Sequence, residues 1–483
     1  MSLIHLTVVL EVLEVREKIN GAKIQMQIDP TIFRAYDIRG IVDESLTEET
    51  VRLIGQAIGS EAQARGEKTI SIGRDGRISG PRLSKMLCQG ILDSGCDVID
   101  IGTVPTPVLY FATHIFASSS GVMLTGSHNP SNYNGLKIVL AEETLALDEI
   151  QKLYQRIINN DLTTGQGTAQ QKNIDEQYLE RICGDVKIEK PLKVVIDCGN
   201  GIGGEIAPKL FKRLGCEVKG LFCEIDGNFP NHHPDPSEPK NLKDLICAVK
   251  KEKADVGIAF DGDCDRLGIV TNDGEVVWPD RQLMLFAIDV LSRNKDAEII
   301  FDVKCTKHLQ DVISEHYGKA VMWKTGHSFI KEKLREEKNA LLAGEMSGHM
   351  FFKERWYGFD DALYAGARLL EIISKQDKTI AEIFNELPDS INTPELKLPI
   401  SETEKFKFMD KFKQQAKFED GNIITIDGIR VDFSNGFGLI RPSNTTPYLV
   451  LRFEANNAEK LKQIQEMFRR EILKTDSSLK LPF

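Results

Sequence analysis

The chain has 483 residues, a hydrophobic content of 41%, a charged content of 28% and a net charge of -11. This length predicts several domains, and the composition is that of a folded globular protein, not of a disordered or membrane protein. The acidic balance, without any basic stripe along the sequence, excludes nucleic acid as an expected partner. An anionic ligand would therefore have to be bound by local positive groups.

The first 28 residues carry Glu11 and Glu14 where the apolar segment of a signal peptide would run. We expect them to form an extension outside the fold. No apolar run reaches the roughly eighteen residues that a membrane span requires, so no membrane partner is expected. The nine cysteines are scattered, odd in number and without a CxxC pair, which predicts neither a disulfide framework nor a zinc site and favours a cytoplasmic location.

Three segments follow the same order of patterns, at residues 69–102, 193–222 and 298–326. Each has a short apolar run, a polar loop, a stretch with helical periodicity and a second apolar run, which predicts three βαβ units. Their strands are expected as continuous apolar runs because helices would cover both faces of each sheet.

Each unit is followed by a further apolar run that ends in a polar loop: GVMLTGSHNP, ADVGIAFDGDCDRLG and NALLAGEMSGH. Ligands of open α/β sheets bind beyond the carboxyl ends of strands, so chemistry is expected in these loops. Composition changes near 160–175, 275 and 388–400 predict domain boundaries. The expected division is an extension (1–28), three α/β domains (29–173, 174–275 and 276–388) and a smaller α+β domain (389–483).

Three carboxylates alternate in FDGDCDR, at Asp261, Asp263 and Asp265. Carboxylates this close repel one another unless a cation compensates them, and a set of oxygen ligands suits Mg²⁺ or Ca²⁺ better than zinc. An EF-hand is excluded because Arg266 occupies its glycine position and Asn272 its glutamate position. The alternative is a solvated Asp-rich turn, although the adjacent Arg266 guanidinium suits a phosphate.

A proline-bracketed loop, RPSNTTP, gathers hydroxyl, amide and guanidinium donors on Arg441, Ser443, Asn444 and Thr445. Such donors fit a phosphate, whereas the simpler interpretation is an ordinary polar turn. The GEMSGH loop offers Glu345 and Ser347 to sugar hydroxyls and His349 as a proton carrier. Its simpler interpretation is a Gly-rich turn between a strand and a helix.

Ser127 and His128 stand in TGSHNP, after the apolar run 121–124. A serine hydroxyl is a weak nucleophile and needs either an activating base or a group to carry. A Ser-His hydrolase dyad is disfavoured because adjacent side chains on a turning chain tend to point apart and because no GxSxG motif surrounds the serine. A capped Asn-Pro turn is the structural alternative. FDGDCDR suits a metal, and RPSNTTP, called the anion loop below, suits a phosphate. Together these loops favour phosphoryl transfer, with Ser127 carrying phosphate.

Together TGSHNP, DGDCDR, GEMSGH, RPSNTTP and the earlier FRAYDIRG resemble the α-D-phosphohexomutase superfamily, in particular its bacterial phosphomannomutase/phosphoglucomutase branch. The resemblance runs from about residue 29 to the end of the chain. It implies an α/β fold of four domains around a central cleft, with three similar mixed α/β sandwich units and a smaller C-terminal α+β domain.

The same resemblance implies a role for each motif. Ser127 would be the phosphoserine, and Mg²⁺ would be bound by one of its oxygens together with Asp261, Asp263 and Asp265. The residues implied around the reacting phosphoryl group are His128, Asn129, Lys137 and Arg266, with Tyr36 and Arg39 in the same pocket and Lys137 or His349 as proton carrier. The residues implied at the substrate are Lys304, Gly326, His327, Glu345 and Ser347, with Arg441, Ser443, Asn444 and Thr445 at the phosphate that is not transferred.

The implied reaction interconverts hexose 1-phosphate and hexose 6-phosphate of mannose or glucose. Phosphoserine would phosphorylate the substrate, and the resulting 1,6-bisphosphate would turn round and return its other phosphate to Ser127. Glucose or mannose 1,6-bisphosphate would act as activator, and the fourth domain as a lid. We expect a monomer whose only partner is the phosphosugar.

Two features bear on this assignment. Cys264 stands where the family commonly has glycine, so we expect it to avoid positive φ. Phosphoglucosamine mutase is the closest rival, but its sugar loop usually reads GEQSGH and its anion loop has glycine and glutamate in place of Asn444 and Thr446, so Met346 and SNTTP favour the mannose/glucose branch. A Mg²⁺-dependent phosphatase would need a site open to water, and a binding protein would tolerate the loss of Ser127.

Overall fold

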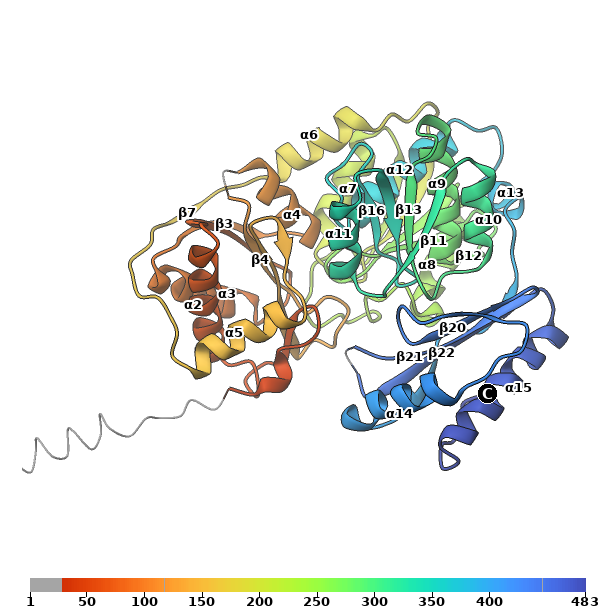
Figure 1. The fold of residues 1–483 in the computed structure, drawn as a ribbon. Helices are drawn as coiled ribbons and strands as arrows, with labels where there is room; N and C mark the ends of the chain where they lie inside the picture. The colour runs from red at the N-terminus through yellow and green to blue at the C-terminus, as the bar shows by residue number, and fades with distance from the viewer. Residues whose placement is uncertain (1–27, 117, 445) are drawn as a thin grey trace, which may run out of the picture.

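The computed structural model describes residues 28–116, 118–444 and 446–483. The expected N-terminal extension, up to residue 27, and Thr445 lie outside this range. Figure 1 shows four β-sheets along the chain, each with its own helices, and places the fourth sheet below the second and third with α14 and α15 on its far side. No helix in the described ranges combines the length and hydropathy that a membrane crossing requires.

The helices begin and end as follows. In chain order they are η1 (Pro30–Ile32), α2 (Glu48–Ala64), α3 (Gly80–Ser94), α4 (Thr106–Ile115), α5 (Asp148–Ile158), α6 (Asp175–Asp185), α7 (Gly203–Arg213), η2 (Pro239–Leu242), α8 (Lys243–Glu252), α9 (Pro279–Arg293), α10 (His308–Glu315), α11 (His327–Glu336), α12 (Ala362–Ser374), α13 (Ile380–Asn385), α14 (Glu402–Gln415) and α15 (Ala458–Thr475). Side-chain caps start several of them. For example, the Asp361 carboxylate accepts a hydrogen bond from the Tyr364 amide at the start of α12.

The strands form four sheets, in each of which the strands lie side by side in the following order. The first sheet is β1 (Ile38–Ile41), β5 (Tyr133–Leu140), β4 (Gly121–Leu124), β2 (Thr69–Arg74), β3 (Asp97–Thr103) and β7 (Ala169–Gln171), with β6 (Glu143–Thr144) beside β5. The second is β12 (Val276–Val277), β11 (Leu267–Thr271), β10 (Val256–Phe260), β8 (Lys193–Asp197) and β9 (Glu217–Leu221). The third is β14 (Lys319–Trp323), β13 (Glu298–Asp302), β15 (Ala340–Gly344) and β16 (Met350–Phe352). The fourth is β17 (Ile391–Asn392), β22 (Tyr448–Ala455), β21 (Gly436–Pro442), β20 (Ile429–Phe433) and β19 (Asn422–Ile424), with β18 (Leu396–Pro399) beside β22.

The first three sheets repeat one arrangement, which confirms the three predicted βαβ units. In each, the first strand of the unit lies between its second strand and the following apolar strand, and all three run parallel. An antiparallel strand then pairs with the last of these: β5 with β4, β11 with β10 and β16 with β15. The three polar loops therefore connect equivalent strands, at the carboxyl ends of β4, β10 and β15.

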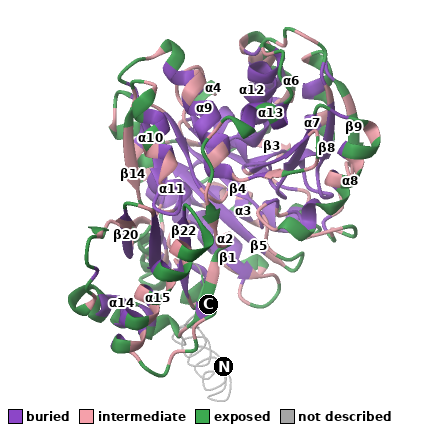
Figure 2. Cartoon of the chain, turned by 90° about the vertical axis from the view of Figure 1, so that its right-hand side faces the viewer, coloured by how far each residue is buried: buried purple, intermediate pink, exposed green. Residues whose placement is uncertain are grey.

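The prediction of continuous apolar strands holds for the inner strands but not for two edge strands. β8, β10 and β13 are buried along almost their whole length, whereas β9 and β14 are largely exposed or half-buried. Figure 2 shows this difference at β9, which lies at the rim of its sheet. An edge strand has a neighbour on one side only, so polar side chains such as Lys219 remain in water.

The apolar core is shared unequally among the four units. One continuous cluster runs from α4 of the first unit through the second and third units, and it includes Phe111, Phe211, Phe286 and Tyr364. The fourth unit has a separate cluster between its sheet, α14 and α15. A small apolar contact of Val303 with Phe437 and Leu439 joins the third and fourth units. The fourth unit is thus packed mainly on itself, as expected for a smaller α+β domain.

Candidate functional site

Ser127 lies in the loop that follows β4, and its side chain is 3% exposed. Its Oγ is 3.0 Å from His128 Nδ1 and 3.1 Å from Asp261 Oδ2 in the second unit. The expectation that the side chains of Ser127 and His128 would point apart is therefore wrong. Ser127 has a φ of +47°, and this left-handed turn brings the imidazole back towards the hydroxyl.

Hydrogen bonds inside the first unit hold this loop in its turn. The Asp75 carboxylate accepts from Thr125 Oγ1 at 2.8 Å and from the Gly126 amide at 3.1 Å. Thr125 Oγ1 in turn accepts from the Ser127 amide at 2.8 Å, and the Asn129 amide donates to the Gly126 carbonyl at 2.9 Å. The serine is consequently presented on a fixed backbone.

Asp261, Asp263 and Asp265 lie in the loop after β10 and are fully buried, with one carboxylate oxygen of each within 4.8 Å of the others. Backbone amides of Asp265 and Arg266 both donate to Asp261 Oδ1 at 3.1 Å. Lys137 on β5 reaches this cluster, because its Nζ is 2.8 Å from Asp263 and also contacts Asp265. The structure thus joins the serine loop and the aspartate loop in one site.

The aspartate cluster fits a hard divalent cation. Burial, reinforced by Asp265 and Asp263, holds the pKa of Asp261 well above its usual range, so the three charges are not balanced by protein groups alone. Asp263 Oδ1 is buried without a hydrogen-bond partner. The available ligand atoms are carboxylate oxygens, beside the hydroxyl of Ser127, and such ligands are those of Mg²⁺ or Ca²⁺.

Cys264, inside the same loop, has a φ of +64°, so the expectation that it avoids positive φ is wrong. Its side chain is fully buried, and its Sγ fills the space beside Gly203, where an added Cβ would lie only 2.5 Å away. The Cys264 side chain therefore has room because the neighbouring helix begins with glycine. The aspartates on either side keep their cluster.

Charges around the site set the protonation of its basic groups. Burial lowers the pKa of Lys137, but Asp263 and Asp265 outweigh it, so this pKa stands well above its usual range. Burial also lowers the pKa of His349, and Asp265 and Glu345 again outweigh it, so the pKa is raised. By contrast, burial and Arg266 hold the pKa of His128 well below its usual range. Lys137 and His349 thus favour the protonated form, and His128 the neutral form.

The loop after β15 brings the predicted sugar-binding residues to the same place. His349 Nδ1 is 2.8 Å from Ser347 Oγ and 3.1 Å from Glu345 Oε2, while its Nε2 is 3.3 Å from Asp265. Arg266 Nε lies 3.4 Å from His349 Nε2, and the backbones of these two residues form an isolated bridge. The third loop therefore contacts the aspartate loop directly.

The segment 326–327, at the start of α11, adjoins this loop. The Gly326 amide donates to Glu345 Oε1 at 2.6 Å, and Gly326 has a φ of +140°. The His327 ring lies 5.6 Å from that of His349. Tyr36 of the first unit packs 5.8 Å from the His327 ring, and a Cβ at Gly326 would lie 2.8 Å from Tyr36. Glycine is therefore required there both by backbone conformation and by space.

Arg39 and Tyr36 link the serine loop to the anion loop. The Arg39 guanidinium donates to the Gly126 carbonyl and pairs with Asp37. Tyr36, three residues earlier, lies close to Arg441 and Asn444 of the fourth unit, and burial raises its pKa to about 12. This short segment of the first unit thus contacts both ends of the candidate site.

The RPSNTTP loop of the fourth unit holds a partly unsatisfied guanidinium. Arg441 Nε donates to Asp427 at 2.9 Å, while the buried Nη2 of Arg441 has no hydrogen-bond partner. Ser443 Oγ is 2.7 Å from Thr446 Oγ1. Nζ of Lys405 donates to the carbonyls of Ser443 and Thr446 at 2.6 and 3.1 Å, which fixes the loop from behind. An anion can therefore bind to Arg441 without breaking an existing pair.

Lys304 of the third unit also faces the fourth. Its Nζ is 2.5 Å from Glu395 and 3.8 Å from Asp302. A cavity of about 260 Å³ opens where the anion loop meets the other units, and it is lined by residues that include Leu147, Lys324, Phe329, Asp427 and Asn444.

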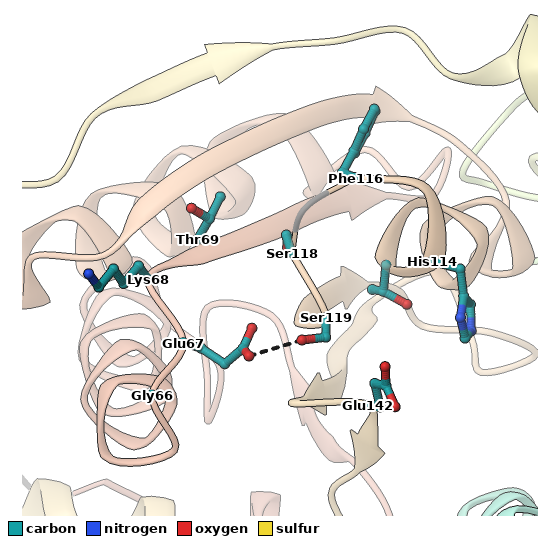
Figure 3. A pocket seen from close by; sticks show the side chains of 10 residues that line it. Gly66, Glu67, Lys68, Thr69, His114, Phe116, Ser118, Ser119 and Glu142 are labelled. Carbon is teal, nitrogen blue, oxygen red and sulfur yellow. Dashed lines mark hydrogen bonds between the residues drawn. The ribbon is translucent and has the colours of Figure 1, made fainter.

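A second pocket lies away from this site. It has a volume of about 460 Å³ and is lined by Glu67, Thr69, His114, Ser119 and neighbouring residues. Figure 3 shows Ser119 donating to the Glu67 carboxylate within it. These residues precede or begin β2 and β4, whereas Ser127 follows the opposite end of β4. The pocket is therefore separate from the site described above.

Several residues around the site were not predicted from the sequence. Asp75 and Arg77 bind the serine loop, Asp427 pairs with Arg441, and Glu395 pairs with Lys304. Asp235 lies close to both His128 and Arg266. The polar loop after residue 74 was the only available signal for the first two, since it occupies the carboxyl end of β2 as the predicted loops do for their strands.

The arrangement agrees with comparisons to known proteins. The chain matches the family models of four phosphoglucomutase/phosphomannomutase domains. They are α/β/α domain I at residues 30–164, α/β/α domain II at 176–274, α/β/α domain III at 278–391 and the C-terminal domain at 395–471. The chain belongs to this family.

Relatives within the family match the chain over nearly its whole length. A phosphomannomutase/phosphoglucomutase of Pseudomonas aeruginosa is 57% identical over 453 residues, covering 94% of this chain and 98% of the relative. A phosphoglucomutase of Neisseria meningitidis is 54% identical over 442 residues, covering 91% and 96%. The crystal structure of a family protein from Burkholderia thailandensis matches with a TM-score of 0.91 and 51% identity, covering 95% of this chain and all of that one.

Proposed function

We propose that the chain is a phosphohexomutase that interconverts the 1-phosphate and 6-phosphate of mannose, glucose or both, through phosphoserine at Ser127 and a hexose 1,6-bisphosphate. The observation that carries this proposal is the position of Ser127 Oγ, buried and 3.1 Å from a carboxylate of the three-aspartate cluster. The names of the relatives from Pseudomonas aeruginosa and Neisseria meningitidis support it.

Mg²⁺ is the proposed cofactor, held by Asp261, Asp263, Asp265 and an oxygen of the phosphorylated Ser127. When bound, it would neutralise part of the negative charge on the phosphoryl group. The buried, partnerless Asp263 Oδ1 and the all-oxygen donor set support this choice.

The surrounding side chains supply charge and protons. During transfer the bond from phosphorus to Ser127 Oγ breaks and a bond to a sugar hydroxyl oxygen forms, and the proton that this hydroxyl loses is balanced by the proton that Ser127 Oγ gains. Arg266 and Lys137 are placed to balance charge on the moving group. Since Lys137 and His349 favour their protonated forms, they are suited to donate a proton to the departing oxygen.

Both phosphates of the bisphosphate need a binding place. Arg441, with its unpartnered Nη2, together with Ser443, Asn444 and Thr445, would hold the phosphate that is not transferred. Glu345 and Ser347 would exchange their contacts with His349 for sugar hydroxyls. Turning the bisphosphate end for end would then present its other phosphate to Ser127. Glucose or mannose 1,6-bisphosphate would accordingly activate enzyme that has lost its phosphate.

The protein would work as a monomer in a reducing cytoplasm. All of its proposed ligand loops come from a single chain, and all nine cysteines are free thiols. The small contact between the third and fourth units supports movement of the fourth unit as a lid that keeps water from the phosphoserine.

The deciding experiment is a coupled assay on mannose, glucose and glucosamine 1-phosphates, each with and without a trace of hexose 1,6-bisphosphate, for the wild type and Ser127→Ala. We expect Ser127→Ala to lose nearly all turnover while sugar-phosphate binding, measured by calorimetry, remains. Ser131→Ala, at an exposed serine of the same loop, is the matched control and should stay active. Phosphopeptide mass spectrometry should locate phosphate on Ser127 in the wild type.

Two outcomes would contradict the proposal. Full activity of Ser127→Ala would exclude a phosphoserine mechanism. Strong preference for glucosamine 1-phosphate would transfer the chain to the phosphoglucosamine mutase branch, and release of inorganic phosphate at the rate of turnover would indicate a phosphatase.

A further inference from the structure

Arg77 lies in the loop after β2, is 2% exposed, and is directed at the backbone of the serine loop. Four of its hydrogen bonds end on main-chain carbonyl oxygens. The partners are Pro130 and Tyr133 for Nη1, at 2.6 and 2.9 Å, and Ser127 and Asn129 for Nη2, at 2.8 and 2.6 Å. One guanidinium thus contacts the loop on both sides of the serine.

The remaining donor of Arg77 is also occupied. Its Nε donates to Asp75 Oδ2 at 3.2 Å. A guanidinium has five N–H donors, and these five bonds use all of them. Arg77 therefore has no donor left for a substrate phosphate, in contrast to Arg441, whose Nη2 is unpartnered. Its contribution to the site must pass through the backbone that it holds.

The backbone held by Arg77 is one that would not keep this shape unaided. Ser127 has a φ of +47°, a conformation that serine adopts rarely, and it persists only where surrounding contacts enforce it. The Ser127 carbonyl is one of those bound by Arg77. The guanidinium also fills the space beside Gly126, since an added Cβ there would lie 2.1 Å from it. The lack of a side chain at Gly126 therefore leaves the space that the Arg77 guanidinium occupies.

Arg77 also contacts the unit that carries the aspartate loop. Its guanidinium lies 5.2 Å from the ring centroid of Phe229, and a Cβ at Gly227 would lie 2.9 Å from its Cα. The serine loop and the aspartate loop also lie close together, since a Cβ at Gly262 would lie 2.5 Å from the Ser127 carbonyl oxygen. The residue that holds the serine loop is thus wedged against the second unit, beside the aspartates.

We propose that Arg77 is a positioning residue for phosphoryl transfer: by binding the carbonyls on both sides of Ser127, it holds the hydroxyl against the aspartate cluster of the second unit. This inference rests on the phosphoserine function proposed above. Arg77 itself does not touch the substrate. Its loss should leave sugar-phosphate binding intact but displace the atom that accepts and donates the phosphoryl group, and a displacement of about 1 Å can lower a rate by roughly 10²-fold.

The test compares Arg77→Lys and Arg77→Ala with the wild type in steady-state assays and in the rate at which hexose 1,6-bisphosphate phosphorylates Ser127, followed by phosphopeptide mass spectrometry. We expect kcat and the phosphorylation rate to fall by roughly 10²-fold with KM for hexose 1-phosphate changed by less than about threefold. Arg77→Lys, which keeps the charge but offers three donors, should recover only a small part. Guanidinium ion, added at a sub-denaturing concentration to Arg77→Ala, should restore part of kcat.

Arg368→Lys is the matched control, because Arg368 is equally buried but pairs with Asp289 and Glu354 in the third unit. It should lower the melting temperature without changing the phosphorylation rate of Ser127. If Arg77→Ala does not fold, Arg77→Lys decides on the same two readouts. A wild-type phosphorylation rate in a folded Arg77 variant, or a higher KM at unchanged kcat, would refute the positioning role. Ser127→Ala, assayed in parallel, separates the two proposals, since its activity would overturn the phosphoserine itself.

Discussion

Ser127 Oγ lies 3.1 Å from Asp261 Oδ2, although 134 positions separate the two residues in the chain. They occupy equivalent places in two copies of one structural unit, because each follows the apolar strand that pairs with an antiparallel neighbour. The third copy places Glu345 and His349 in the corresponding loop, and His349 reaches Asp265 at 3.3 Å. Repetition of the unit thus directs three loops of different chemistry towards one point.

Removal of divalent cations should abolish activity. We expect EDTA to reduce the mutase rate by at least about 10²-fold and Mg²⁺ to restore it, because the aspartate cluster has no other full charge balance. Asp263→Asn should raise the Mg²⁺ concentration needed for half-maximal rate by at least about tenfold. A Mg²⁺ titration of the coupled assay measures both effects. Asp273→Asn, at an exposed aspartate of the β11–β12 turn, should behave as the wild type. An EDTA-treated enzyme that keeps its rate would contradict the metal assignment.

Changes at Arg441 should act mainly on substrate affinity. Hydrogen bonds to a charged group contribute about 1.5–3 kcal/mol, so Arg441→Ala should raise KM for hexose 1-phosphate by roughly 10- to 100-fold. Arg441→Lys keeps the charge but not the planar fork, and should give an intermediate value. Steady-state kinetics on both variants, with Arg470→Lys on the exposed side of α15 as control, provide the comparison. If KM stayed constant, the anion would have to be bound elsewhere.

Stability should depend on pH through Asp361. Burial raises the pKa of this carboxyl to about 7, above the ordinary aspartate value of 3.8. Between these values the folded protein binds more protons at this residue than the unfolded chain, so the stability contribution of Asp361 falls as pH rises from about 4 to about 7. The full difference corresponds to about 4 kcal/mol.

Asp361→Asn removes this titration and leaves an oxygen at Oδ1 for the hydrogen bonds from Tyr178 and the Tyr364 amide, whereas the Trp356 indole loses its acceptor at Oδ2. The melting temperature of Asp361→Asn should therefore change less between pH 4.5 and 7 than that of the wild type, because this pH range lies between the unfolded and folded pKa values of Asp361. Asp377→Asn, at an exposed aspartate, serves as control and should follow the wild-type curve. Parallel curves for wild type and Asp361→Asn would show that Asp361 is charged in the folded protein at low pH.

Cys264→Gly should be nearly neutral. Glycine removes the cost of a left-handed cysteine, about 1 kcal/mol, but it also removes a buried Sγ and increases the freedom of the unfolded chain. We expect the free energy of unfolding to change by less than about 1 kcal/mol and the Mg²⁺ dependence to be kept. Cys264→Val should be clearly destabilising, because a β-branched residue tolerates positive φ poorly. Chemical denaturation of the two variants would distinguish these effects, and a neutral Cys264→Val would argue against backbone strain at this position.

The motifs in the sequence were sufficient to predict which loops carry the site, but not how their side chains are held. Ser127, Asp261 and Glu345 follow apolar runs with a visible pattern, so their position at strand ends could be predicted. The contact of Ser127 with His128 depends on a positive φ that no local residue preference announces. Arg77 could not be predicted because its partners are backbone carbonyls, which every residue has.

The ion-pair partners of Arg441 and Lys304 could not be predicted from the sequence either, because they come from distant segments. Asp427 and Glu395 lie in unremarkable polar stretches, and only the approach of the third and fourth units brings Glu395 to Lys304. The exposed faces of β9 and β14 depend likewise on which strands end up at sheet edges. The space for the buried Cys264 side chain is left by Gly203, sixty-one positions away in the chain.

The separate core of the fourth unit has a mechanical consequence. Where this unit meets the third, Arg430 and Arg452 bind the carbonyls of Val303, Cys305 and Lys304. Ion pairs of Arg452 with Asp280 and of Lys304 with Glu395 also cross between the two units, and the apolar contact beside these polar contacts is small. Hydrogen bonds to carbonyl oxygens can be exchanged for hydrogen bonds to water at little net cost in free energy. Separating a large apolar surface would cost much more free energy. A swing of this unit would divide the small cluster of Val303, Phe437 and Leu439 but leave the main cores whole, so the enzyme could admit and release sugar phosphates at each cycle with its folded units unchanged.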